Sequence, residues 1–192
     1  MAHTPKFAHV VLTTTRLPAM RDWYCTVLDA HVVHENEGLC FITFDEEHHR
    51  LAFVTAPEGA LVERPPNSAG LMHTAYTFPN LGALLDRYAT LKSAGIEPQV
   101  PIQHGVTTSL YYRDPDGQFV EMQIDNFESA DAATAYMRSD EFDKDPIGPA
   151  YDPQRMFDAY HSGVPEQTLK TRAWALAGPP MPHPMELFAK AE

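Results

Sequence analysis

Two histidines and one glutamate have the residue types of a metal site. His9 and His73 lie at equivalent places in two short apolar runs, and superposing the runs requires a shift of 64 residues. A pseudo-twofold axis relating the two runs would bring their strands together. With Glu121, the histidines would present two imidazoles and one carboxylate on a single face, which suits non-haem Fe(II). A pair of hydrogen-bonded core histidines explains the same pattern.

Glu121 and Tyr111 lie on either side of a tight-turn signature, Asp114–Gly117. A hairpin centred there would place Glu121 opposite Ser109 and Tyr111 opposite Phe119. Glu121 and Tyr111 would then be diagonal neighbours, roughly 7–8 Å apart at the backbone. A carboxylate and a phenol on the inner face of a curved sheet are consistent with a functional role, but this pattern alone favours the structural explanation. The alternative is that Glu121 points to solvent.

Other histidines stand next to expected strands. His48 and His49 precede one strand, and His104 precedes the strand that contains Tyr111. Histidine and tyrosine near a metal are the usual groups for proton transfer, although a histidine beside a loop is more often simply exposed. The two cysteines, Cys25 and Cys40, are interpreted as small apolar residues rather than nucleophiles.

The 64-residue repeat indicates how these residues are positioned. Each copy contains a helix with apolar residues at helical spacing, one with Pro18 in its first turn and one between Asn80 as N-cap and Gly95 as stop. One strand precedes each helix and three follow it. The expected strands are 7–13, 31–35, 39–44 and 50–55 in the first copy, and 71–78, 96–101, 107–112 and 118–124 in the second. A Pro/Gly-rich connection, 56–70, joins the copies. The fold class is therefore α+β, with two βαβββ modules at about 6–56 and 70–126 forming a cupped mixed sheet.

The chain from residue 127 to 192 differs from the repeat and predicts a helical, Pro-rich extension of a domain formed by residues 1–126. Expected helices cover 129–142, 153–163 and 165–177, with a loop at 145–153, and four prolines then break regular structure. The extension contains Tyr136, Met156, Phe157, Tyr160 and Trp174. Because such side chains favour burial, we expect residues 129–177 to pack on the domain or on a partner chain.

Composition limits the possible partners. The chain has 192 residues, with 14 Lys and Arg against 26 Asp and Glu, giving a net charge of −12. Phosphate backbones and anionic membrane surfaces would repel such a chain, so neither nucleic acid nor a membrane is an expected partner. The apolar runs are far short of the ~20 residues of a membrane span. The N-terminus has no signal-peptide pattern, so a reduced cytoplasmic location is expected.

Several motifs resemble the vicinal oxygen chelate (glyoxalase/bleomycin resistance/dioxygenase) superfamily. Within it, the chain is similar to one-domain type I extradiol dioxygenases of the 2,3-dihydroxybiphenyl 1,2-dioxygenase group. The resemblance covers residues 6–126, and the extension up to Gly148 is also similar. It depends on the His9-Val10-Val11 strand, the Trp23-Tyr24 helix, the run His48-His49-Arg50-Leu51-Ala52-Phe53 and the segment from Tyr111 through Asp114-Pro115-Asp116-Gly117 to Glu121.

This resemblance implies an extradiol (meta) ring-cleavage dioxygenase. Fe(II), with Mn(II) as an alternative, would be bound by His9, His73 and Glu121. O2 would be the co-substrate and a catechol-type aromatic diol the substrate. The acid–base residue would be His49. The resemblance assigns His104 and Tyr111 to substrate contact. A homodimer or higher homo-oligomer is expected because the apolar side chains of the extension need cover.

One departure from the two-domain extradiol enzymes concerns His104, and one comparison favours the extradiol group over the glyoxalase I type. The segment from His104 to Tyr111 is shorter than in two-domain extradiol enzymes. The first copy ends in Leu51–Thr55 without the acidic fourth ligand of the glyoxalase I type. A metal-dependent isomerase or epimerase would need neither His49 nor O2. A non-catalytic ligand-binding member of the superfamily would not need the full ligand set.

Overall fold

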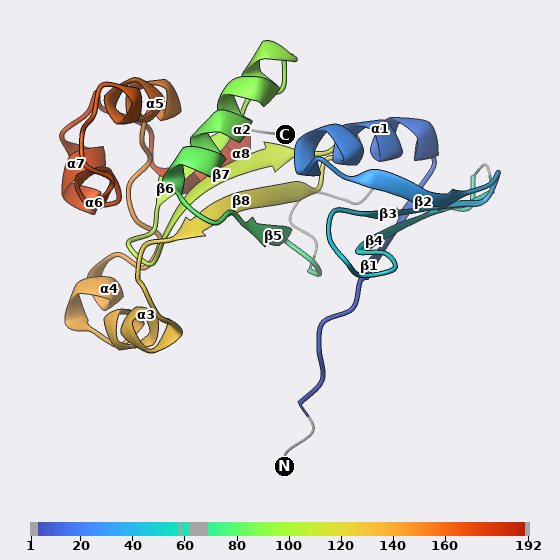
Figure 1. Cartoon of the computed structure of the whole chain (residues 1–192), viewed down its shortest axis with the longest axis horizontal. Helices are drawn as coiled ribbons and strands as arrows, with labels where there is room; N and C mark the ends of the chain where they lie inside the picture. Colours follow the sequence, from blue (N-terminus) through green and yellow to red (C-terminus); the bar gives the residue numbers. More distant parts are fainter. Residues whose placement is uncertain (1–3, 58, 62–68, 191–192) are drawn as a thin grey trace. The chain divides into compact units, whose positions relative to one another are not determined.

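The computed structural model describes residues 4–57, 59–61 and 69–190. The chain divides into two compact units (Figure 1). Unit 1 comprises Met1–Gly70 and the turn Asp114–Gln118, and unit 2 comprises Leu71–Arg113 and Phe119–Glu192. Each unit contains one copy of the repeat. Part of the predicted connection at 56–70 lies outside the described residues.

Unit 1 contains a four-stranded mixed sheet with one helix. The strands are β1 (Val10–Thr14), β2 (His31–Glu35), β3 (Leu39–Thr43) and β4 (Leu51–Thr55), in the order β1-β4-β3-β2. β1 runs parallel to β4, and the other pairs are antiparallel. Helix α1 (Leu17–Leu28) contacts β3 and β4, and Pro18 lies in its first turn as expected. Its buried side chains, Leu17, Met20, Tyr24 and Val27, follow the predicted apolar pattern.

Unit 2 repeats this topology, which confirms the predicted duplication and the α+β class. Its strands are β5 (His73–Thr77), β6 (Val100–Gln103), β7 (Thr107–Arg113) and β8 (Phe119–Asp125), in the order β5-β8-β7-β6. Helix α2 (Leu81–Ser93) has the predicted N-cap, because the side chain of Asn80 accepts a hydrogen bond from the backbone N–H of Ala83. Gly95 follows with a φ of +77°, a conformation that favours glycine and ends the helix.

Two strand predictions need correction. β6 begins at Val100 rather than Ile96, because the N–H of Ile96 still bonds the carbonyl of Leu91 at the end of the helix. In the β7–β8 hairpin, Tyr111 pairs with Glu121 rather than with Phe119.

The shift in the hairpin comes from its turn. The carboxylate of Asp114 accepts hydrogen bonds from the N–H groups of Asp116 and Gln118, and the backbone N–H of Asp114 bonds the carbonyl of Gln118. Gly117 has a φ of +83°, as a three-residue hairpin loop requires. The loop is therefore centred one residue later than the sequence suggested.

The extension contains shorter helices than predicted. They are α3 (Ala130–Met137), α4 (Asp140–Lys144), α5 (Pro153–His161), α6 (Glu166–Leu169), α7 (Arg172–Leu176) and α8 (Pro184–Lys190). Ser139 and Thr171 divide the two longer predicted helices, because each side chain caps the helix that follows it. Pro184 does not end regular structure but begins α8, where a missing N–H costs nothing.

The extension belongs to unit 2 and packs on the helix and the sheet of that unit. Helix α5 contacts α2, and α8 contacts β6. Just before α5, Ala150 forms an isolated bridge with Ile102 and Tyr151 is almost fully buried, as is Met156 within α5. None of the helices in the described ranges has the length and apolar character that crossing a bilayer requires.

Candidate active site

His73 and Glu121 lie side by side in unit 2. His73 begins β5 and pairs with Phe119 of the parallel strand β8, and Glu121 follows Phe119 by two residues and so shares its face. His73 Nε2 is 3.0 Å from Glu121 Oε2. Glu121 is only 4% exposed. Burial alone would raise the pKa of this carboxyl, but hydrogen bonds from His73, Ser109 and Tyr111 outweigh it and lower the pKa.

Tyr111 connects this pair to His104. Tyr111 stands directly opposite Glu121 and forms a hydrogen bond with it. Its hydroxyl oxygen is also 3.0 Å from His104 Nε2, and which of the two donates depends on the histidine tautomer. The four residues form a continuous polar chain, His104–Tyr111–Glu121–His73. Burial raises the pKa of Tyr111 and lowers that of His104, so both side chains are neutral near pH 7.

The loop that carries His104 is fixed by residues that the sequence analysis missed. The carboxamide of Asn126 donates to Gln103 Oε1 and to the carbonyl of Gly105. Arg172, from α7, donates to the carbonyl of His104. Gly105 has a φ of +87°, and a Cβ there would overlap the hydroxyl of Tyr136. The glycine after His104 was the one local signal of this close packing.

Unit 1 gathers the other predicted histidines. The rings of His9 and His49 have centroids 4.3 Å apart, and Nδ1 of His48 is 2.6 Å from Nδ1 of His49. Phe41 stacks on His49 at 4.6 Å with an interplanar angle of 13°. Burial, followed by the neighbouring His9 and His48, lowers the pKa of His49, which favours the neutral imidazole.

Contacts of the first strand and of the segment before it explain why His9 lies next to His49. The backbone N–H of Val10, at the start of β1, bonds the carbonyl of Arg50. The guanidinium of Arg50 donates to the carbonyls of Phe7 and Ala8, and it also pairs with Asp45 at 2.9 Å. These bonds hold the segment before His9 against the residue that follows His49.

The donor atoms suit a divalent transition metal. Imidazole nitrogens and a carboxylate oxygen are ligands that bind Fe(II), and the ionised Glu121 is buried where a cation would offset its charge. Nδ1 of His73 is buried without a hydrogen-bond partner among the described residues. Among the residues that the structure describes, no group of three or more His, Cys, Asp or Glu side chains has the arrangement of a metal site. His73 and Glu121 belong to unit 2, and His9 and His49 belong to unit 1.

The cysteines do not contribute to either group. Cys25 and Cys40 are free thiols, in α1 and β3 respectively. Burial raises the pKa of Cys40 to about 11 and also raises that of Cys25. Because the thiolate is the nucleophilic form, neither thiol is activated.

Comparisons with known proteins show the family of the chain. Residues 6–122 match the family described as the Glyoxalase/Bleomycin resistance protein/Dioxygenase superfamily. Biphenyl-2,3-diol 1,2-dioxygenase 2 of Rhodococcus globerulus is 63% identical over 186 residues, which cover 96% of this chain and 97% of that protein. Biphenyl-2,3-diol 1,2-dioxygenase 3 of the same organism is 58% identical over 176 residues, covering 92% and 93%.

Solved structures share the fold of the repeated part. A glyoxylase/bleomycin resistance protein/dioxygenase domain from a Frankia species has a TM-score of 0.53 at 18% identity, covering 64% of this chain and 99% of that one. Lactoylglutathione lyase of Agrobacterium tumefaciens has a TM-score of 0.51 at 16% identity, covering 63% and 94%. At these identities the likeness concerns the fold alone.

Proposed function

Because the chain belongs to the glyoxalase/bleomycin resistance protein/dioxygenase superfamily, we propose that it is an extradiol ring-cleavage dioxygenase. The substrate would be a catechol-type aromatic diol, and both atoms of O2 would enter the product. The observation that carries the proposal is the dioxygenase name of two relatives that are 63% and 58% identical over nearly the whole chain. The polar chain of unit 2 supports it, since a phenol and a neutral imidazole lie beside two candidate metal ligands.

The proposed metal is Fe(II), with Mn(II) as an alternative, held by His9, His73 and Glu121. His73 and Glu121 already present Nε2 and Oε2 3.0 Å apart, and His9 would complete two histidines and one carboxylate. The bound ion would supply a Lewis acid that favours the deprotonated diol, together with the electron for reaction with O2.

The protein's own groups would handle protons and orientation. Tyr111 and His104, whose polar atoms are 3.0 Å apart, would hold one diol oxygen through hydrogen bonds. A neutral His49 has one unprotonated ring nitrogen, which can accept a proton and later return it. Stacking of Phe41 on His49 limits rotation of the imidazole and so fixes the direction of that transfer.

Further proposals concern the substrate and the setting. Biphenyl-2,3-diol, which names both relatives, is the first diol to test. Residues 1–126 would form the catalytic domain and 127–192 its extension. We also propose that the protein is cytoplasmic and that it forms a homodimer or higher homo-oligomer. Light scattering on the purified protein would test the oligomeric state.

One experiment tests the activity. The protein is loaded with Fe(II) under anaerobic conditions, mixed with a panel of catechols including biphenyl-2,3-diol, and exposed to O2. We expect O2 uptake in step with a yellow ring-opened product. An iron-loaded protein that consumes no O2 with any diol would favour a metal-dependent isomerase or a ligand-binding protein of the same superfamily.

A further inference from the structure

The C-terminal helix α8 brings an aromatic side chain to the face of unit 2 that carries the polar chain. The ring of Phe188 meets the ring of Tyr111 edge to face, with centroids 5.2 Å apart and an interplanar angle of 79°. It meets Phe119 in the same way, at 4.9 Å and 89°. Both contacts have the geometry that aromatic pairs favour.

Strand register shows how close these contacts are to the proposed ligands. Tyr111 pairs with Glu121, and Phe119 pairs with His73. Side chains of directly paired residues lie on the same face of a sheet. Phe188 therefore lies on the ligand-bearing face, against the immediate strand neighbours of His73 and Glu121.

That face has a polar part and an apolar part. The polar part is the chain His104–Tyr111–Glu121–His73. The apolar part is a cluster of four buried side chains with two partly buried ones from α8; its members are Val100, Ile102, Tyr111, Phe119, Leu187 and Phe188. Tyr111 belongs to both parts, through its hydroxyl and its ring. A ligand whose diol meets the polar part would have apolar surface beside it.

We propose that Phe188 is a specificity-determining residue that forms an apolar wall for the substituent of an aryl-substituted diol. The inference rests on the proposed function and adds the part of the chain that selects among diols. Phe188 is only partly buried, so its ring keeps surface available for a ligand. Phe and Leu side chains would favour a second aromatic ring over a charged or small substituent.

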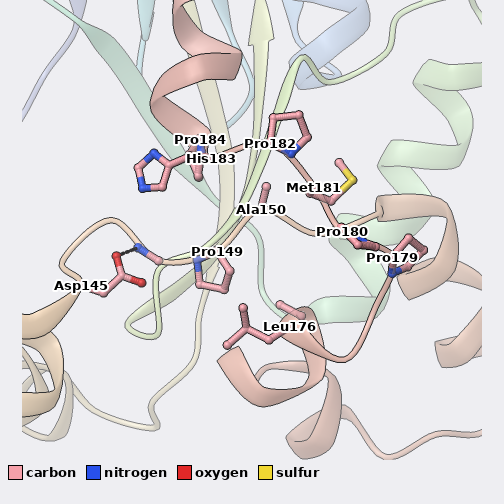
Figure 2. Close-up of a pocket in the computed structure, with 12 residues that line it drawn as sticks. Asp145, Pro149, Ala150, Leu176, Pro179, Pro180, Met181, Pro182, His183 and Pro184 are labelled. Carbon is pink, nitrogen blue, oxygen red and sulfur yellow. Dashed lines mark hydrogen bonds between the residues drawn. The ribbon is translucent and has the colours of Figure 1, made fainter.

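A proline-rich segment leads into α8, and contacts at both ends of the helix hold it in place. Figure 2 shows the proline-rich segment between α7 and α8 running beside Pro149 and Ala150. Together with Asp145 and His183, these residues border a pocket of about 340 Å³. Pro184 at the start of α8 is buried, and Leu187 and Phe188 fix its other end. Truncating Phe188 could therefore loosen α8, so a conservative variant is needed.

The test compares Phe188→Ala and Phe188→Leu with Met185→Ala, a control on an exposed side chain of the same helix. For Phe188→Ala we expect kcat/KM with biphenyl-2,3-diol to fall about 10- to 100-fold, mainly through KM. With unsubstituted catechol the change should stay within about threefold, since catechol lacks the second ring. Phe188→Leu should recover most of the loss, and Met185→Ala should match the parent protein.

A second readout does not depend on turnover. Binding of each diol to the iron-loaded protein is measured without O2 by ultraviolet difference absorbance. We expect Phe188→Ala to weaken binding of biphenyl-2,3-diol about 10- to 100-fold and to spare catechol. Equal losses for both diols, or unchanged binding of both, would overturn the role of Phe188. A parent protein that binds the diols but consumes no O2 would instead contradict the proposed activity.

Discussion

β2 and β6 are equivalent strands in the two units, and their surroundings differ greatly. Each is the last strand in its sheet order and pairs with one neighbour. All five residues of β2 are exposed, including Val32 at 40% and Val33 at 49%, whereas all four residues of β6 are buried. The repeat therefore sets the topology of the two sheets but not their exposure.

The extension accounts for the difference. The backbone N–H of Gln103 bonds the carbonyl of Pro149, and the N–H of Tyr151 bonds the carbonyl of Pro101. These bonds satisfy edge groups that would otherwise face water. Glu121 and Tyr111 are each 4% exposed in this covered unit, while His9 in unit 1 is exposed. The covered unit thus provides a buried carboxylate and a buried phenol, and the uncovered unit provides the exposed His9.

The largest expected effect comes from removing a ligand of the covered unit. His73→Ala leaves the buried Glu121 without its nitrogen partner, so we expect iron content to fall to near zero and turnover to fall to the uncatalysed level. Loss of a group that only supports a ligand costs about 10–100-fold, and loss of a ligand should cost more. Plasma mass spectrometry for iron and an O2 electrode measure both.

Two variants sharpen this result. His9→Ala keeps the His73–Glu121 pair, so we expect it to retain part of the iron. His161→Ala removes an exposed histidine of α5 whose described ion-pair partner is Asp86, and it should behave like the parent protein. A His73→Ala protein with a full complement of iron would show that the covered unit does not hold the metal.

The next effect concerns proton transfer in the uncovered unit. His49→Gln keeps a polar side chain of similar size but removes the group that titrates. We expect turnover to fall by about 10²–10⁴-fold, while iron content and anaerobic catechol binding remain close to those of the parent. His31→Gln is the control, because His31 is an exposed residue of β2 in the same sheet. Near-normal turnover of His49→Gln would move the proton-transfer role elsewhere.

Local sequence pattern was sufficient to predict the order and type of the elements in the repeated part of the fold. The equivalence of His9 and His73 followed from the repeat, and caps such as Asn80 followed from residue type. The hairpin register failed because the carboxylate of Asp114 organises a loop whose centre a turn signature cannot locate to one residue. Helix α8 was missed because a proline both ends and begins helices, depending on position.

The sequence was enough to propose each candidate site residue, but not the residues that hold those side chains in place. Arg172 lies 68 residues from His104, and no local pattern connects them. The same holds for Phe188 and Tyr111, whose contact depends on how the extension folds back on β6. Sequence identifies the chemical groups, whereas tertiary packing determines what holds them.

A smaller effect tests how the extension holds the His104 loop. The side chain of Arg172 is 14% exposed and donates to the carbonyl of His104. Because hydrogen bonds involving a charged group contribute about 1.5–3 kcal/mol, we expect Arg172→Met to lower the free energy of unfolding by that amount. Urea unfolding followed by circular dichroism measures it. Lys170→Met, which breaks only a described surface pair with Glu166, should cost about 0.3–0.5 kcal/mol, and equal costs would exclude the anchoring role of Arg172.

The last effect concerns a buried carboxyl of unit 1 and depends on pH. Tyr24 donates to Oδ2 of Asp114 at 3.0 Å, and burial raises the pKa of Asp114 despite this bond. A raised carboxyl pKa contributes stability that is fully present below the ordinary value of about 3.9 and is lost as the pH rises through the folded-state pKa. Tyr24→Phe removes a donor to the charged form and should raise the pKa further.

We therefore expect Tyr24→Phe to cost about 1–3 kcal/mol of unfolding free energy at pH 7, and less at pH 4, where more of the buried carboxyl is protonated. Urea unfolding at the two pH values gives the difference. The same change made in an Asp114→Asn background is the control, since an amide does not titrate and the pH dependence of the cost should vanish. If the cost of Tyr24→Phe is the same at both pH values, the bond to Asp114 does not stabilise the charged carboxylate.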